Sequence, residues 1–513
     1  MSHRVSGTSS TPPTGSALDT AIARSFSVRE PALAASPLRA LGRRQLSGAE
    51  VLAQSVATTA PAAGMIGLPV AMLQRSSPAD GFVAIVVATA VTVLIALCVS
   101  QFTRRMAAAG GLYTFAAKGA GRRTALTVGV ALAVKYCGSA AVTLYLGGQQ
   151  LVVVLGRFGV DATGPAGTLA VYGLVAAAIL MVVFRGARFA AIAILAVELC
   201  SLALIGFLLV LDDGGGPPPD IDPSATPHTV PLLTLWATFA LAGFESAAFL
   251  GPEARRPLVT VTRTVLWTPV ICGGLCIVAT WAVWSGRGTT LISAYLHGSA
   301  AGVAPGLVTA VQVAVMCSWF ASAMASFNAS SHLLYTMGVE KVLPSPFRLV
   351  HRRFRTPYGA LTAVATLVTG ACLTMALARP ETSAPVAALR PTVQGSLLLA
   401  YVLVAIACLR FLRRINELTP FVRVAVILAS TAGAALLGHL LYYSVTAYDA
   451  VVFSALCAIG VSGIAAVFLL RRFRPASLSA LGVFDSAESN DVLPGSASYG
   501  TNERGLPALV RKR

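Results

Sequence analysis

The chain has 513 residues, of which 56% are hydrophobic and only 11% are charged, and its formal net charge is +18. This composition excludes every class of soluble globular protein and predicts a polytopic membrane protein. The positive charge does not indicate nucleic-acid binding, because the basic residues are distributed as membrane topology requires. Residues 1–47 are polar and lack the apolar core of a signal peptide, so they are predicted to form a disordered tail.

Stretches of about 20 apolar residues, the length that crosses a bilayer, predict twelve spans within a membrane domain over residues 48–474. The spans lie near residues 50–73, 81–103, 124–153, 167–184, 187–211, 231–254, 261–285, 304–337, 357–378, 393–412, 420–443 and 449–470. Residues 475–513 are rich in Ser, Gly and Asn and end in Arg-Lys-Arg. They are predicted to form a second disordered tail.

Basic residues are unevenly distributed between the two sides of these spans. Of the 38 Lys and Arg residues, 32 fall in the two tails and in alternate loops or the span ends beside them. One, Lys135, lies inside a span, and five fall on the opposite side, namely Arg75, Arg157, Arg287, Arg379 and Arg390. The positive-inside rule therefore predicts a multi-pass protein of the cell membrane with an even number of spans and both termini in the cytoplasm.

All nine cysteines lie singly within predicted spans and show no CxxC spacing. They are interpreted as small apolar packing residues, and neither a disulfide framework nor a metal site is predicted. No sequence pattern indicates a cofactor.

The first span, residues 51–73, is interrupted by Pro61, Gly64, Gly67 and Pro69. Proline removes a backbone donor and clashes with the preceding turn, and glycine lowers the cost of leaving helical geometry. Two interpretations fit this pattern: a kinked span, or a helix broken at membrane depth. Non-helical backbone at that depth is stable only where protein or a water-filled cavity satisfies it, so a true break indicates a binding site.

The acidic loop between residues 211 and 231 divides the spans into two sets of five, residues 50–211 and 231–412, followed by two more spans in 420–470. An odd number of spans in each set inserts the second set upside down relative to the first. This arrangement predicts an inverted repeat in which the sixth span is broken at the place that corresponds to the break in the first.

The sixth span carries such an interruption. Gly243 lies in its middle, Glu245 follows two residues later, and Gly251, Pro252 and Glu253 end it. Interrupted spans at corresponding positions of two repeats are the best sequence indication of a central binding site in secondary transporters.

Four stretches in order resemble the amino acid-polyamine-organocation superfamily of permeases. They are Ala60-Pro61-Ala62 in the first span, the GGLYTFAAKGAGRRTALTVG loop at 110–129, FALAGFESAAFLGPEARRP at 239–257 and SHLLYTMGVEKVLPSPFRLVHRRFRTP at 331–357. The resemblance implies an all-α membrane protein of twelve transmembrane helices, with an inverted 5+5 repeat, broken helices 1 and 6, and two C-terminal helices. It also implies a secondary transporter domain over residues 48–474, in the bacterial amino acid permease branch.

The chain departs from the family pattern near the end of its eighth span. His332 stands where the family usually has arginine, and Val339-Glu340-Lys341 replaces the usual Arg-Asp-Gly. These departures concern the inner gate more than the fold.

Three ionisable residues lie well inside spans, where burying a charge is expensive and usually functional. The resemblance implies gating by Glu245, with a structural hydrogen bond to the loosened backbone as the alternative. It places Glu198 at the secondary cation site, where the residue would bind a proton or a cation; an ion pair or a structural acid are the alternatives. Lys135, roughly 16 Å deep, is expected to pair with Glu198 or to meet a substrate carboxylate.

The substrate is expected to bind mainly to backbone groups that the two breaks release. The N–H groups at the start of the second half-helix suit a carboxylate, and the carbonyls of the sixth span suit an ammonium group. The predicted substrate-binding residues are Pro61, Ala62, Ala63, Gly64, Phe239, Ala242 and Gly243. The resemblance implies that Phe239 covers the substrate as a gate, although an ordinary packing role stays open. A possible cation site is assigned to Ser322, Ser326 and Asn328, which could equally be interhelical contacts.

The predicted function is secondary active transport of an amino acid or related organic amine by alternating access, coupled to protons through Glu198 and Glu245. No Walker motif occurs, so the energy comes from an ion gradient or from exchange. The alternatives are an exchanger, a channel and a non-transporting nutrient sensor. No HExxH or GxSxG motif occurs, so an enzyme is not predicted. The expected partners are the lipid bilayer, a small-molecule substrate and a co-transported proton, and a zwitterion is favoured over a strongly cationic polyamine.

Overall fold

The computed structural model describes residues 40–42, 45–73, 77–211, 229–298, 303–378, 384–447, 450–482, 497–501 and 507–511. Within this part of the chain, twelve helical segments are long and apolar enough to cross a membrane, and all twelve predicted spans are thereby confirmed. The spans are α2 (Gly48–Thr59) with α3 (Pro61–Leu73), α4 (Pro78–Thr103), α6 (Arg122–Arg157), α7 (Pro165–Phe184), α8 (Ala187–Leu211), α9 (Val230–Ala240) with η2 (Phe244–Glu253), α10 (Pro257–Trp284), α12 (Pro305–Val339), α13 (Tyr358–Ala378), α15 (Leu389–Arg414), α16 (Pro420–Ala447) and α17 (Val451–Phe473).

Shorter elements connect these spans. They are α5 (Leu112–Ala120), α11 (Thr289–His297), η4 (Ser345–Arg348), α14 (Ala384–Ala387), α18 (Pro475–Ala480), β1 (Ala497–Thr501) and β2 (Pro507–Arg511). The two strands form an antiparallel pair. The prediction of a wholly disordered tail from residue 475 is therefore wrong for α18 and the strand pair. Most of the predicted N-terminal tail, residues 1–39, lies outside the described residues.

The first span is a broken helix, as the sequence pattern allowed. Helix α2 ends at Ala60, which adopts a left-handed conformation with φ 50° and ψ 57°, and α3 begins at Pro61. Proline suits the first position of a helix because its missing N–H has no partner there, and its fixed φ is already helical. The kinked-span interpretation is excluded.

The sixth span is broken at the corresponding place. Helix α9 ends at Ala240, a short turn follows, and the chain continues from Phe244 as the 3₁₀ helix η2, in which every residue is buried. Gly243 makes this turn possible, because its φ of +135° is one that residues with a side chain rarely adopt. The two breaks, one in each repeat, confirm the predicted inverted arrangement.

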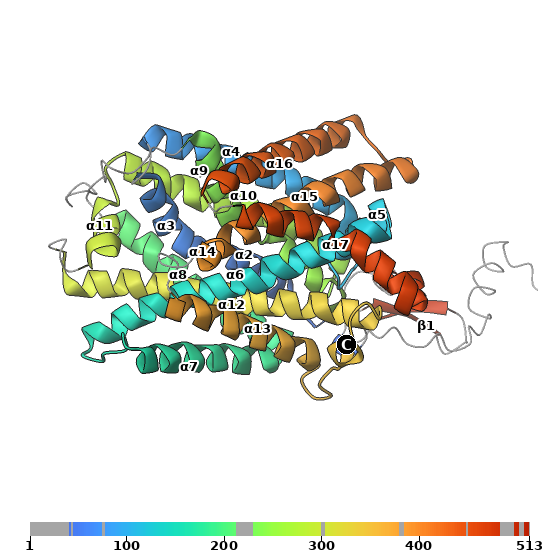
Figure 1. Cartoon of the computed structure of the whole chain (residues 1–513), viewed down its shortest axis with the longest axis horizontal. Coiled ribbons are helices and arrows are strands. Elements are labelled where there is room, and N and C mark those ends of the chain that lie inside the picture. Colours follow the sequence, from blue (N-terminus) through green and yellow to red (C-terminus); the bar gives the residue numbers. More distant parts are fainter. Residues whose placement is uncertain are drawn as a thin grey trace, which may run out of the picture.

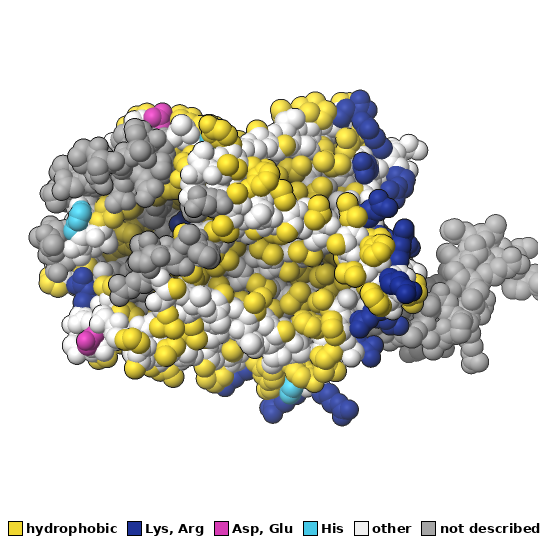
Figure 2. Space-filling model, viewed as in Figure 1, with side chains coloured by type: hydrophobic (Ala, Val, Ile, Leu, Met, Phe, Trp, Pro, Cys, Tyr) yellow, Lys and Arg dark blue, Asp and Glu magenta, His cyan; other side chains and the backbone are white. Residues whose placement is uncertain are grey.

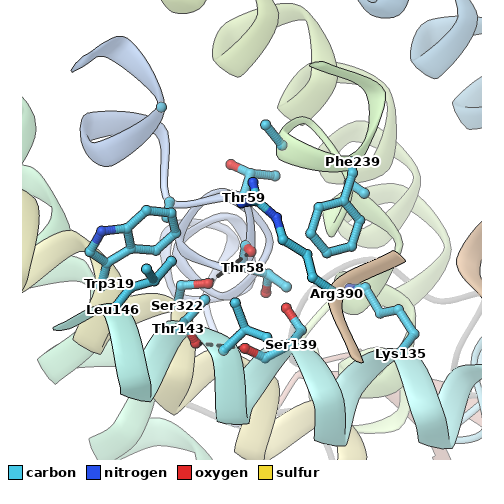
Figure 3. Close-up of a pocket in the computed structure, with 15 residues that line it drawn as sticks. Thr58, Thr59, Lys135, Ser139, Thr143, Leu146, Phe239, Trp319, Ser322 and Arg390 are labelled. Atoms are coloured by element: carbon cyan, nitrogen blue, oxygen red, sulfur yellow. Dashed lines mark hydrogen bonds between the residues drawn. The ribbon is translucent and has the colours of Figure 1, made fainter. Parts of the chain in front are cut away.

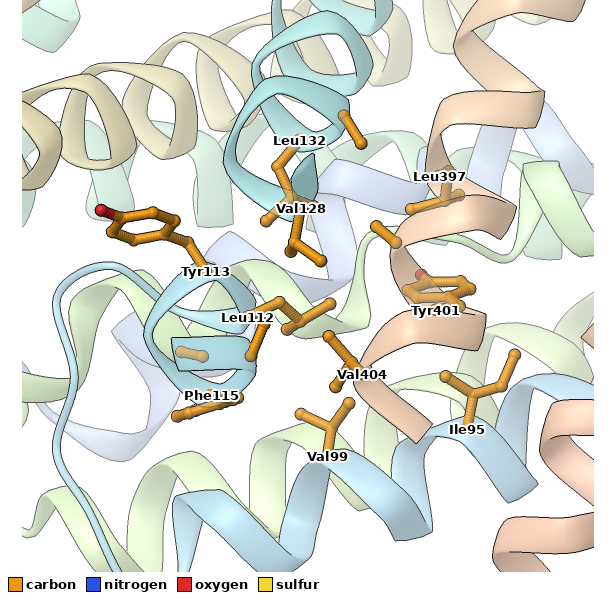
Figure 4. Close-up of a cluster of buried hydrophobic side chains, with 14 of the residues drawn as sticks. Ile95, Val99, Leu112, Tyr113, Phe115, Val128, Leu132, Leu397, Tyr401 and Val404 are labelled. Atoms are coloured by element: carbon orange, nitrogen blue, oxygen red, sulfur yellow. The ribbon is translucent and has the colours of Figure 1, made fainter. Parts of the chain in front are cut away.

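The long helices run side by side along the longest axis of the molecule (Figure 1). Helix α12 packs against both α6 and α8, and α6 also packs against α15 and α17. A cluster of buried apolar side chains from α4, α5, α6 and α15 fills the space between these elements, including Val99, Leu112, Leu132 and Leu397 (Figure 4). This packing fixes α6 and α15 beside the two broken spans.

One end of the bundle is basic. Lys and Arg side chains gather there in Figure 2, around α5 and the final turns of α15 and α17, which carry Arg413, Arg414, Arg471 and Arg472. We call this the basic end, and we call the end that carries α11 the opposite end (Figure 1). Residues at both extremes of the described membrane domain, Leu46 and α18, lie at the basic end.

Backbone pairing closes the basic end beneath the breaks. Leu46 forms a parallel β-bridge with Ala254, and its N–H donates to the carbonyl of Glu253 at 2.9 Å. The Glu253 carboxylate in turn contacts His332 Nε2 at 2.7 Å. The segment before the first span is thus joined to the end of the sixth span and, through Glu253, to the C-terminal part of the eighth.

Candidate functional site

A cavity with about 70 Å³ of space for water-sized molecules lies where the two breaks meet (Figure 3). It is lined by side chains from both broken spans, from α6 and α12, and from the start of α15. The lining residues are Thr58, Thr59, Ala60, Gly64, Lys135, Ser139, Val142, Thr143, Leu146, Phe239, Ala240, Ala242, Trp319, Ser322 and Arg390. None of these described lining residues is Asp or Glu.

The structure brings three of the seven predicted substrate-binding residues to this cavity: Gly64, Phe239 and Ala242. Pro61, Ala62 and Ala63 lie just behind the break and are absent from its lining, and Gly243 forms the turn of the sixth span. Sequence analysis named Ser322 only for a possible cation site, and it missed the other hydroxyl-bearing residues and Trp319. Their positions on α2, α6 and α12 follow from tertiary packing and leave no local pattern.

Most hydroxyl groups of the cavity have their protons directed away from it. Thr58 donates to the Gln54 carbonyl at 2.6 Å, and Thr59 donates to the Val56 carbonyl at 2.6 Å. The other two donors are Thr143, which bonds the Ser139 carbonyl, and Ser322, which bonds the Thr58 carbonyl. A hydroxyl that donates in this way keeps oxygen lone pairs as acceptors, so these side chains can receive hydrogen bonds from a cation.

Arg390 enters the cavity from the first turn of α15. Its side chain crosses the cavity beside Phe239 toward Thr59 (Figure 3). The same residue lines a second hollow of about 230 Å³ together with Trp236. Its charge also reaches α11, where burial raises the pKa of the Tyr295 phenol and the Arg390 guanidinium opposes that rise. Sequence analysis assigned Arg390 to a loop, because a charged residue at a span end has the hydropathy of a loop.

Lys135 pairs with Glu245, and the prediction that it pairs with Glu198 is wrong. The distance from Lys135 Nζ to Glu245 Oε1 is 3.4 Å, and both side chains are at most 1% exposed. Tyr136 and Tyr401 each donate a hydrogen bond of 2.7 Å to the Glu245 carboxylate, and the Gly243 N–H donates a third. The orientation of α6 directs Lys135 toward η2, which carries Glu245, rather than toward α8, which carries Glu198.

Glu198 lies instead behind the cavity, at the N-terminus of α3. Its Oε1 accepts the Ala62 N–H at 3.3 Å and the Ser318 hydroxyl at 3.0 Å. The neighbouring Ala63 N–H donates to the Ser318 hydroxyl oxygen at 3.2 Å. The positive end of this half-helix therefore already faces a carboxylate of the protein itself. The expectation that the Ala62 and Ala63 N–H groups are free for a substrate is not met.

The residues assigned to a possible cation site form hydrogen bonds with different partners, and these bonds do not converge on one point. Asn328 Nδ2 donates to Gln54 Oε1 at 3.0 Å, and Ser322 donates to the Thr58 carbonyl at 3.0 Å. Among the described atoms, Ser326 Oγ has no hydrogen-bond partner. Within the described part of the chain, no group of three or more His, Cys, Asp or Glu residues is placed to hold a metal ion.

Comparisons with known proteins agree with this architecture. A family model described as amino acid permease matches residues 53–469. The fold is similar to the crystal structure of a mutant manganese transporter from Eremococcus coleocola, at 12% identity and a TM-score of 0.51, covering 83% of this chain and 94% of that one. It is also similar to the same transporter in complex with an aromatic bis-isothiourea substituted compound, at 12% identity and a TM-score of 0.52, covering 82% and 95%. No curated protein matches the chain in sequence.

Proposed function

Because the chain belongs to the amino acid permease family and is a membrane transporter, we propose that it moves an amino acid or related organic amine by alternating access, coupled to protons. The observation that carries the proposal is the cavity between the two helix breaks, since transporters of this architecture place their substrates at the repeat interface. The protein's partners are then the bilayer, a small amine-bearing substrate and a proton.

An ammonium group fits this cavity. Phe239 and Ala240 lie at the C-terminal end of α9, where a helix carries partial negative charge. The acceptor oxygens of Thr59 and Ser322 face the same space. Phe239 lines the cavity at the end of α9, beside the Arg390 side chain, and this position supports its role as the residue that covers the substrate (Figure 3).

Glu198 is the proposed proton-binding group. Its Oε1 holds the first N–H of α3 that has no helical partner, and its buried Oε2 has no hydrogen-bond partner among the described atoms. Protonation removes the negative charge from the positive end of α3 and weakens its attachment to α8. The first broken span is then free to move relative to α8 and α12 when a proton binds.

Glu245 is the proposed gating residue. Its carboxylate connects η2 to α6 through Tyr136 and Lys135, and to α15 through Tyr401. Movement of the sixth span breaks these contacts. New contacts must form as it moves, because leaving a buried charge without its partners is strongly destabilising.

The basic end is proposed to face the cytoplasm, with both termini on that side of the cell membrane. The gathering of Lys and Arg at this end supports the orientation (Figure 2). The structure then represents a state closed toward the cytoplasm, because Leu46 and Ala254 are paired beneath the cavity. Opening toward the cytoplasm requires the Leu46–Ala254 pairing to separate.

Uptake by the purified full-length protein in proteoliposomes tests this proposal. A screen of the standard amino acids and their decarboxylated amines by thermal stability first identifies a ligand, because binding to the folded state stabilises it. An imposed inside-alkaline pH gradient is then expected to drive accumulation of the labelled ligand. Glu198→Gln should lose this response and keep exchange of ligand across the membrane. Asp161→Asn, at an exposed position outside the spans, serves as the matched control.

Two results would contradict the proposal. Uptake that ignores the pH gradient and follows only the ligand gradient would replace proton coupling by exchange or facilitated diffusion. Failure of every amino acid and amine to bind or to be taken up would remove the substrate class itself.

A further inference from the structure

A buried histidine and a buried glutamate contact each other at the basic end of the bundle, away from the cavity lining. His332 lies in the C-terminal part of α12, and Glu253 is the last residue of η2. The distance from His332 Nε2 to Glu253 Oε1 is 2.7 Å, and the two side chains are 2% and 6% exposed. Neither residue belongs to the proton and substrate sites proposed above.

Both ring nitrogens of His332 face oxygen atoms that accept hydrogen bonds. Nδ1 lies 2.8 Å from the backbone carbonyl of Asn328, and Nε2 lies 2.7 Å from the Glu253 carboxylate. A neutral imidazole has one N–H and one bare nitrogen, so it can donate to only one of these two oxygens. Both contacts are satisfied only when the pair carries one proton more than a neutral histidine beside an ionised glutamate.

Glu253 is the partner with which His332 holds this proton. Within the described part of the chain, it is the charged group that acts on His332. Tyr335, also on α12, interacts with the Glu253 charge, but a phenol stays neutral near pH 7. The other acidic residues of α12 and of the elements packed against it have partners of their own, namely Glu50 with Arg188, Glu198 with Ser318, Glu245 with Lys135 and Glu340 with Tyr113. The basic residues at this end of those elements are exposed, namely Arg122, Arg123, Arg188, Lys341 and Arg348.

The same glutamate keeps the basic end closed through its backbone. The Glu253 carbonyl accepts the N–H groups of Gln45 at 2.7 Å and of Leu46 at 2.9 Å, and the Arg255 N–H donates to the Leu46 carbonyl at 2.9 Å. When the end of the sixth span moves away from α12 and from the segment before α2, the carboxylate leaves His332 and the backbone pairing separates. Opening of the basic end therefore exposes the ring to water.

We propose that His332 and Glu253 form a proton-binding site that controls opening toward the cytoplasm: the closed pair holds one proton, and opening releases it. This inference rests on the proposed alternating access and adds a proton site distinct from Glu198. A histidine in water loses its proton above about pH 6.5. Above that pH each opening releases one proton, so the ratio of open to closed protein should rise by up to about tenfold per pH unit. Low cytoplasmic pH keeps this side closed.

Hydrogen–deuterium exchange of the purified full-length protein in lipid nanodiscs tests the site without any substrate. Protection is measured for peptides that contain Leu46 or Arg255 and is corrected for the intrinsic pH dependence of exchange. In the wild-type protein it should fall by up to about tenfold per pH unit between about pH 6.5 and pH 8.5. His332→Arg keeps a cation beside Glu253 at every pH, so protection should stay high and lose its pH dependence. Glu253→Gln removes the carboxylate without adding bulk and should abolish the pH dependence as well.

His297→Gln is the control variant, because His297 is an exposed histidine on α11 at the opposite end. It should respond to pH as the wild-type protein does. Equal corrected protection of the wild-type protein at both ends of the pH range would overturn the inference. A pH response that survives in His332→Arg or in Glu253→Gln would assign it to another group and overturn the inference too. Each of these failures leaves the proposed transport standing, since the uptake experiment tests transport separately.

Discussion

At the scale of single residues, the buried charges are each held by a specific set of partners. Glu245 accepts hydrogen bonds from Tyr136, Tyr401 and the Gly243 N–H and pairs with Lys135, while no part of its side chain is exposed. A buried pair of this kind adds little net stability, but removing one partner leaves an uncompensated charge. The cluster therefore fixes how η2 sits against α6 and α15.

Lys135→Met should lower the free energy of unfolding by about 3–5 kcal/mol, because it leaves the Glu245 carboxylate buried without its cation. The double variant Lys135→Met/Glu245→Gln should lose less than the single one, since no charge remains. Denaturant titration of the detergent-solubilised protein measures both values, with Lys118→Met as the control outside the cluster. A double variant that is less stable than Lys135→Met would refute this view of the cluster.

At the scale of elements, the two breaks differ in what their backbone requires. Ala60 adopts a left-handed conformation that glycine also adopts readily. Gly243 has φ +135°, and a Cβ added there would lie 2.7 Å from Thr58 Cγ2. The first break therefore tolerates a change of residue type, and the second does not.

Gly243→Ala should destabilise the protein by about 2 kcal/mol or more, from backbone strain together with the clash against Thr58. Ala60→Gly should change stability by no more than about 1 kcal/mol, because relief of strain offsets the greater freedom of the unfolded chain. Gly274→Ala, where an added Cβ meets nothing within 4 Å, is the matched control. Thermal unfolding of the three variants ranks them, and a Gly243→Ala variant as stable as Gly274→Ala would contradict the account.

At the scale of the whole molecule, closure of the basic end depends on few contacts. The Leu46–Ala254 bridge joins the segment before the first span to the end of the sixth. Arg105 and Glu417 form an ion pair between the loops that follow α4 and α15. Because these contacts join different spans, the proposed transport cycle requires them to break and reform.

A disulfide between Leu46→Cys and Ala254→Cys should stop transport, because it holds the basic end closed. Ligand binding at the cavity should persist, and a reducing agent should restore uptake. The single Leu46→Cys variant controls for the substitution itself. Undiminished uptake by fully cross-linked protein would mean that this pairing does not separate during transport.

The sequence supports the fold prediction more fully than the site prediction, for a physical reason. Spans and breaks depend on local features such as apolar length, Pro61 and Gly243, so all twelve spans and both breaks were predictable. Partners depend on how helices rotate against one another. Tyr401 contacts Glu245 from 156 residues away, and Lys135 faces η2 rather than α8. Arg390 resembles a loop residue by hydropathy, although the packing of α15 directs it into the cavity.

The central claim is that the substrate binds in the cavity between the two breaks, and a ligand-bound structure tests it most directly. The full-length protein is imaged in lipid nanodiscs with a saturating concentration of the amino acid that stabilises it most. Density for the ligand is predicted in this cavity, beside Thr59 and Phe239, with its amine toward the end of α9. Ligand density at another site, with this cavity empty at saturation, would contradict the account.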